Sequence, residues 1–100
     1  MILRRDPFVW QVQVRREVLD EEMHRLREVP YSVWHGTLRR DMIKEARARD
    51  NKLYRVRIST DWAHSGSDDI RVTAALESPG LRRRLMDLSF VITPDNQFRS

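Results

Sequence analysis

The chain has 100 residues, of which 40% are hydrophobic and 34% are charged, and its formal net charge is +4. This length predicts a single domain over residues 1–100, with one hydrophobic core and no deep internal cavity. The absence of cysteine excludes disulfides and thiolate metal sites. No stretch is apolar enough for a signal peptide or a membrane span, so we expect a cytoplasmic protein without a membrane partner.

The basic side chains are seventeen arginines and two lysines. This skew is typical of a GC-rich bacterial genome and less often reflects selection for guanidinium chemistry, so it indicates a bacterial protein. The charge is unevenly placed, because residues 39–57 hold eight basic and three acidic side chains. The positive charge is therefore concentrated in one segment, which is the part of the sequence best suited to an anionic partner.

Residues 7–28 are predicted to form one long helix. Asp6 followed by Pro7 is a typical helix start, with an N-cap residue and a proline at the first helical position. Apolar residues then keep approximately helical spacing, at Phe8, Val12, Leu19, Met23 and Leu26. The alternation along residues 8–14 would also suit a strand. Residues 15–17 contain no turn chemistry to end such a strand, so the helix is favoured.

Pro30 ends this helix, because its ring clashes with the preceding turn and it lacks a backbone donor. Residues 31–36 are expected to form one short helical turn, with Ser32 as its cap and Gly36 as its stop. The aromatic side chains of this turn, Tyr31 and Trp34, are expected to close one end of the core.

Residues 53–77 carry the strongest periodic signal. Apolar and polar residues alternate along 53–62 and again along 70–77, on either side of a polar loop. The inward set is Tyr54, Val56, Ile58, Thr60 and Trp62, then Ile70, Val72, Ala74 and Leu76. A period of two is typical of half-buried strands, so we predict an antiparallel hairpin with one buried face.

Residues 41–48 admit two interpretations. Apolar residues there have helical spacing, at Leu38, Met42 and Ala46. Against a helix, residues 49–52 (RDNK) are a turn sequence that leads directly into the strand at 53–62. We therefore predict a first strand over 41–48, paired with 54–62.

The C-terminal part is predicted to add one more strand. Residues 78–80 (SPG) end the strand at 70–77, and residues 81–88 are expected to be a loop or one helical turn. Residues 89–93 then form the last strand, which Pro94 stops. The predicted fold is α+β: an N-terminal helix and a short helical turn packed on one face of a four-stranded antiparallel meander.

Five stretches together resemble a group of short bacterial proteins, a domain of unknown function, that consist of an N-terminal helix and a small antiparallel sheet. They are DPF at 6–8, VPYS at 29–32, RDNKLY at 49–54, DIRV at 69–72 and SFVITPD at 89–95. These motifs are caps, turns and strand ends. The resemblance therefore implies the architecture, and it assigns no functional residue.

The basic segment supplies the candidate nucleic-acid site. Its candidate residues are Arg47, Arg49, Arg55 and Arg57. If the first two strands pair, these arginines are expected on the outer sheet face, where they would follow phosphates without reading sequence. The aromatic residues that usually stack on bases are missing there, because Tyr54 and Trp62 share the apolar face. Arg82, Arg83 and Arg84 would either supplement this surface or form a simple soluble connection.

The sequence predicts no metal, no cofactor and no catalytic site. The loop at 61–69 contains His64 and three carboxylates, but their spacing fits no metal motif and its SGSD is ordinary turn chemistry. The three histidines, His24, His35 and His64, are far apart and form no nucleophile–base pattern. We therefore expect a protein that is not an enzyme.

A second apolar row on the N-terminal helix is the candidate protein interface. Trp10, Val14 and Val18 recur at four-residue intervals, about a third of a turn from Phe8, Val12 and Leu19. One helix face cannot place both rows fully against a sheet. We therefore expect the row to be covered by the turn at 31–36, by a second copy in a homodimer, or by an unidentified protein partner.

These patterns favour a small bacterial protein that is non-catalytic and acts through protein–protein contacts or self-association. The alternative is a sequence-independent nucleic-acid-binding protein that uses a basic sheet face.

Overall fold

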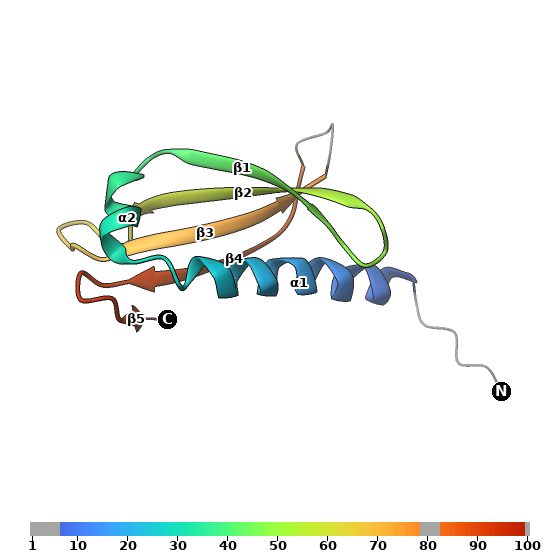
Figure 1. Cartoon of the computed structure of the whole chain (residues 1–100), viewed down its shortest axis with the longest axis horizontal. Coiled ribbons are helices and arrows are strands. Elements are labelled where there is room, and N and C mark those ends of the chain that lie inside the picture. The colour runs from blue at the N-terminus through green and yellow to red at the C-terminus, as the bar shows by residue number, and fades with distance from the viewer. Residues whose placement is uncertain (1–6, 79–82, 100) are drawn as a thin grey trace.

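The computed structural model describes residues 7–78 and 83–99, with side chains from Trp10 onward in the first helix. Its elements are α1 (Pro7–Leu26), α2 (Tyr31–Gly36), β1 (Asp41–Arg47), β2 (Leu53–Trp62), β3 (Ile70–Glu77), β4 (Arg84–Ile92) and β5 (Phe98–Arg99). The strands form one antiparallel sheet in the order β1-β2-β3-β4-β5. Helix α1 runs along one face of the sheet and α2 lies at one end (Figure 1). The predicted α+β meander is confirmed, and the two-residue β5 extends it.

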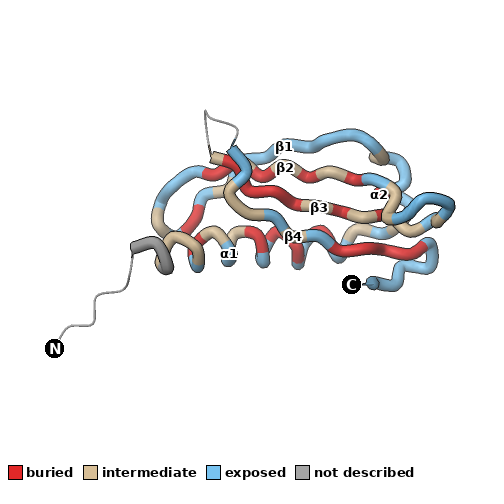
Figure 2. The backbone as a smooth tube through the Cα atoms, turned by 180° about the vertical axis from the view of Figure 1, so that it is seen from behind, coloured by how far each residue is buried: buried red, intermediate tan, exposed pale blue. Residues whose placement is uncertain are grey.

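The core lies between α1 and the inner face of β2, β3 and β4. Helix α1 packs against β3 and β4 and contributes Val14, Leu19, Met23 and Leu26. The sheet contributes the inward residues of the alternating pattern, among them Val56, Val72, Ile70 and Ile92. Burial alternates along β2 and follows the predicted period of two. Figure 2 shows the buried residues along the central strands, while β1 is exposed.

The two apolar rows of α1 are not separate, which corrects the predicted interface. Val14 is 0% exposed and belongs to the core, and Trp10 and Val18 pack against that core. Val12, expected to face the sheet, is only partly buried, and the side chain of Phe8 lies outside the described part. The row therefore does not need a second molecule to cover it.

The physical reason is the width of the buried arc. At about 100° per residue, Val14 and Met23 lie on nearly opposite sides of α1, and both are buried. On one flank, Ala48 and Arg49 of the β1–β2 turn reach the helix near Val14 and Val18. Helix α1 is therefore covered over about half of its circumference, more than a flat sheet would cover.

The start of α2 also differs from the prediction. Pro30 is the N-cap residue and provides no side-chain hydrogen bond, and Ser32 lies within the helix. The backbone N–H of Tyr31 instead donates to Asn96 Oδ1 at 2.8 Å. Asn96 is 65 residues away in the chain, so local sequence patterns could not indicate this cap.

Strand β4 begins at Arg84, five residues before the predicted start at Ser89. Met86 and Leu88 continue the inward alternation of Phe90 and Ile92, and they pack against the core. This period-two pattern was present in the sequence. The arginines beside it obscured the strand. Residues 81–82, the first part of the predicted loop or helical turn, lie outside the described residues.

Candidate interaction site

Two carboxylates hold Arg57 on the outer face of the sheet. Its Nε donates to Glu77 Oε2 at 3.0 Å, and its Nη1 donates to Asp41 Oδ2 at 3.2 Å. The Glu77 side chain is only 8% exposed. These hydrogen bonds, first to Glu77 and then to Asp41, raise the pKa of Arg57. Arg57 of β2 is therefore linked to β1 and to β3 by ion pairs, and the two carboxylates neutralise its positive charge.

Of the other three predicted arginines, Arg47 and Arg55 share the outer face with Arg57, whereas Arg49 does not. Arg49 lies on the helix side, where its Nε is 2.8 Å from Glu17 Oε2 and its guanidinium is 4.3 Å from the centre of the Trp10 ring. The expectation that Arg49 joins the outer face is therefore wrong, because the turn after β1 redirects the chain toward α1. Arg47 donates to the backbone oxygen of Asn51, and Arg55 lies between Glu45 and Glu77 across the ladders.

The arginine cluster at 82–84 is described only in part. Arg82 lies outside the described residues. Arg84 pairs with Asp87 at 3.2 Å at the start of β4.

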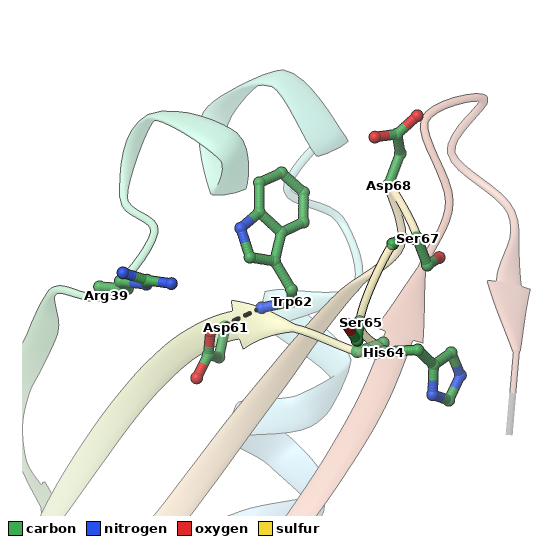
Figure 3. Close-up of a pocket in the computed structure, with 9 residues that line it drawn as sticks. Arg39, Asp61, Trp62, His64, Ser65, Ser67 and Asp68 are labelled. Atoms are coloured by element: carbon green, nitrogen blue, oxygen red, sulfur yellow. Dashed lines mark hydrogen bonds between the residues drawn. The ribbon is translucent and has the colours of Figure 1, made fainter.

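The loop at 61–69 borders an open hollow of about 590 Å³ together with Arg39 (Figure 3). Asp61 accepts a hydrogen bond from the backbone of Trp62, and His64 points away from Trp62. The Oγ of Ser67 accepts a hydrogen bond from the backbone N–H of Asp69 at 3.0 Å. Within the described part of the chain, no three histidine or carboxylate side chains gather as a metal site would require.

An aromatic series fastens α2 to this loop. The ring of His35 lies 6.0 Å from that of Tyr31 and 5.8 Å from that of Trp62. The Tyr31 hydroxyl donates to the backbone oxygen of Asp68 at 2.6 Å. Burial, followed by the charges of Asp68 and Asp69, raises the pKa of Tyr31. These contacts account for His35 structurally, while His24 is exposed and lies 3.9 Å from Glu28.

The open edge of β1 is the feature that the sequence analysis missed. Strand β1 is the first strand in the sheet order, so among the described residues it pairs only with β2. Its seven residues pair in one continuous register, from Asp41–Ser59 to Arg47–Leu53. All of them are exposed except the partly buried Ala46. Met42 is 40% exposed and Ile43 is 51% exposed.

The hydrogen-bond alternation shows which backbone groups face the open edge. The N–H of Ala48 donates to the oxygen of Lys52 at 3.0 Å, one step beyond the Arg47–Leu53 pair. Hydrogen-bonded pairs alternate along an antiparallel ladder, so the even-numbered residues of β1 bond to β2. The odd-numbered residues direct their N–H and C=O groups outward. These free-edge residues are Asp41, Ile43, Glu45 and Arg47.

The next ladder supports the same alternation. The N–H of Ala63 donates to the oxygen of Asp69 at 2.8 Å, one step beyond the Trp62–Ile70 pair. Odd-numbered residues of β2 therefore bond to β3, which leaves its even-numbered residues for β1.

Lys44 is turned away from the open edge. Its Nζ lies 2.9 Å from Glu22 Oε2, and the Glu22 side chain is only 4% exposed. Arg25 approaches the same oxygen at 3.4 Å. The one lysine of β1 is therefore held toward α1 by a buried carboxylate.

Comparison of the chain with protein-family models, curated proteins and solved structures finds no match. The helix-plus-sheet layout nevertheless agrees with the one that the resemblance implied. Among the described residues, no helix combines the length and the apolar character required for a membrane span. The functional argument therefore depends on the residues themselves.

Proposed function

We propose that this is a small, cytoplasmic, non-catalytic bacterial protein that acts through protein–protein contacts. The contact site is the open edge of β1, to which an extended segment of another protein molecule adds as a further strand. One observation carries this proposal: Asp41, Ile43, Glu45 and Arg47 direct their backbone groups outward along a regular strand of seven residues.

The edge of β1 lacks three of the usual protections against pairing, namely a proline, a bulge and a very short length. Proteins normally shield an edge strand with a projecting lysine, a proline, a bulge or a very short strand. Residues 41–47 contain no proline, and their register with β2 contains no bulge. Lys44, which would otherwise project, bonds to Glu22. An added strand therefore meets backbone groups that are ready to pair, each bond contributing about 0.5–1.5 kcal/mol.

The exposed apolar residues of β1 support the same site. Met42 and Ile43 are adjacent, so they lie on opposite faces of the sheet. An added strand would bring its own side chains beside both of them. Ile43, which is 51% exposed, would then bury apolar surface at about 25 cal/mol per Å².

The alternative, a sequence-independent nucleic-acid surface, has less support. Glu77 and Asp41 neutralise Arg57, and Arg49 lies on the helix side. No residue of β1–β4 on the outer face is aromatic within the described chain, so a base would find no stacking platform there. Binding of duplex DNA at low salt, lost in Arg55→Glu but kept in variants of the β1 edge, would favour this alternative instead.

Photo-crosslinking in the cells that make the protein tests the proposal. A photoreactive amino acid at Glu45, on the free edge, is expected to give covalent adducts with a protein. The same label at Asp20, exposed on α1, should give none of these adducts, and Ile43→Pro should remove them. The proposal is wrong if Glu45 gives no adduct, or if its adducts persist in the proline variant.

A further inference from the structure

We infer that the strand added at the β1 edge is β1 of a second copy, antiparallel to the first, with the two-fold axis at Lys44. This inference rests on the proposed function and names the partner. The two sheets then form one continuous sheet through both copies, and the interface is isologous, because each copy contributes the same strand.

Backbone geometry selects this register. Only odd-numbered residues of β1 have free backbone groups, so they must pair with odd-numbered residues of the partner. With the axis at Lys44, Ile43 pairs with the partner's Glu45, and Asp41 with the partner's Arg47. Each of these pairs occurs twice and exchanges two bonds, which gives about eight hydrogen bonds.

Neighbouring registers form fewer bonds. An axis at Ile43 or at Glu45 leaves one free-edge residue of each strand without a partner inside β1, which gives about six bonds. The strand cannot extend backward to compensate, because Arg39 has a φ of 61° and is not extended. Use of all the free backbone groups therefore favours the axis at Lys44.

Charge favours the same register independently. With the axis at Lys44, Asp41 faces the partner's Arg47 at both ends of the paired strands. With the axis at Ile43, Asp41 would face the partner's Glu45, and with the axis at Glu45 the two copies of Glu45 would face each other. Opposite charges on facing residues contribute roughly 0.2–1 kcal/mol for each pair, and like charges cost a similar amount.

The exposed apolar residues also meet in this register. On the outer face, the two copies of Ile43 are diagonal neighbours, about 7–8 Å apart and within reach of each other. On the helix face, Met42 lies opposite the partner's Ala46. The two most exposed apolar side chains of β1 are therefore both covered by the second copy.

The axis at Lys44 places two lysines opposite each other, and α1 removes the resulting repulsion. Each Lys44 ammonium is 2.9 Å from the Glu22 carboxylate of its own chain, which is buried and oriented toward it. Each lysine therefore has a counter-charge, shared with Arg25, within its own copy before the strands meet. This gives the buried Glu22 a role in association that packing alone does not explain.

The helices leave the β1 edge accessible. Helix α1 packs mainly against β3 and β4, and it reaches β1 on the inner face through the Glu22–Lys44 ion pair, which leaves the backbone edge of β1 uncovered. A strand pair without helix contacts buries less than about 1,200 Å², which is typical of weak, reversible complexes. We therefore expect a dissociation constant on the order of micromolar to tens of micromolar.

Paired cysteine variants test both the partner and the register, because the chain has no cysteine of its own. Met42 and the partner's Ala46 form a pair without hydrogen bonds, with Cα atoms about 4.5 Å apart, within the range of a disulfide. Oxidation of an equal mixture of Met42→Cys and Ala46→Cys should give a disulfide-linked heterodimer. Neither variant alone should cross-link. Each variant is first checked for the circular dichroism spectrum of the unmodified protein.

Two further single variants cover the case in which Ala46→Cys does not fold. Lys44→Cys should form a disulfide with the same residue of the second copy, because the two residues face each other at the axis. Ile43→Cys should form no such disulfide. Cross-linking of Met42→Cys alone, or of Ile43→Cys, would overturn the register. The inference that the partner is a second copy is wrong if no variant cross-links and light scattering shows a monomer at about 100 μM, which is well above the expected dissociation constant. In that case, adducts of labelled Glu45 with a different protein would still support the proposed function.

Discussion

The two edges of the sheet differ in how they are protected. At the β4 edge, a bulge interrupts the register at Leu76/Glu77, β5 pairs with Val91 and Ile92, and Arg84 bonds to Asp87. The N–H of Thr93 donates to the backbone oxygen of Gln97. The odd-numbered residues of β4 therefore direct their backbone N–H and C=O groups away from β3. Between the bulge and β5, Asp87 and Ser89 are the only residues whose backbone groups have no strand partner among the described residues. Strand β1 presents twice as many, along an unbroken register.

This difference indicates that the open edge is not simply a consequence of a small sheet. In the described chain, a bulge and a further strand shorten one edge, whereas the other edge has neither of them. One open edge also has a geometric consequence, because two copies that pair through it close the assembly. Two open edges would allow open-ended growth. The asymmetry therefore suits a dimer and disfavours a fibre.

Val14→Glu is expected to have the largest effect, because it destabilises the core on which both edges of the sheet depend. Val14 is 0% exposed, and an unpaired carboxylate there should cost about 4 kcal/mol of unfolding free energy. Trp10→Ala should leave the dimer intact, because Trp10 is not at the β1 edge. Urea unfolding and light scattering measure the two effects. A folded, monomeric Val14→Glu protein would support the helix row as the interface instead.

Two proline substitutions at adjacent positions of β1 distinguish the backbone groups that bond to β2 from those at the open edge. Lys44→Pro removes a donor to β2 opposite the buried Val56, so it should destabilise the fold by about 3 kcal/mol. Ile43→Pro removes only an outward donor, so it should keep the stability and abolish the dimer. Thermal unfolding and sedimentation test this pair. Equal destabilisation by both prolines would show that the assigned alternation is wrong.

Removing protection from the β4 edge should make the two edges more alike. Arg84→Val with Asp87→Val replaces an exposed ion pair by residues that favour strands. We expect species larger than a dimer in sedimentation velocity, since both edges would then pair. Adding Ile43→Pro provides the control, because only β4 contacts would remain and growth should stop at a dimer. A double valine variant that stays dimeric would show that the ion pair does not protect this edge.

Glu22→Gln should weaken the dimer with little loss of stability. Without the carboxylate, the two Lys44 side chains repel at the axis, which should raise the dissociation constant about two- to five-fold. Higher ionic strength should reduce the difference, because it screens the repulsion. Calorimetric dilution of the dimer at two salt concentrations measures the dissociation constant of each variant. An unchanged dissociation constant at low salt would place Lys44 away from the axis.

Much of the fold follows from local patterns. The period of two along β2 and β3 gave their inward faces, and the turn at 49–52 gave the β1–β2 pairing. The extent of burial around α1 did not follow, because it depends on the β1–β2 turn reaching Trp10 and Glu17. The cap of α2 by Asn96 is also set by distant chain.

The candidate site was less predictable than the fold. Composition located the basic segment correctly, but charge counts cannot show that Arg57 bonds to Glu77, which is 20 residues away. The open edge depends on strand order and hydrogen-bond alternation, which exist only once the sheet has formed. The available signal was the adjacent Met42 and Ile43 within a charged segment.

Amide hydrogen exchange of the unmodified protein, at concentrations below and above the dissociation constant, tests the central claim most directly. The account predicts that the amides of Ile43, Glu45 and Arg47 become protected as concentration rises. Those of Lys44 and Ala46 should be protected at both concentrations, and those of Asp87 and Ser89 should exchange at both. Equally fast exchange of the Ile43, Glu45 and Arg47 amides at both concentrations would contradict pairing of the β1 edge with a second copy.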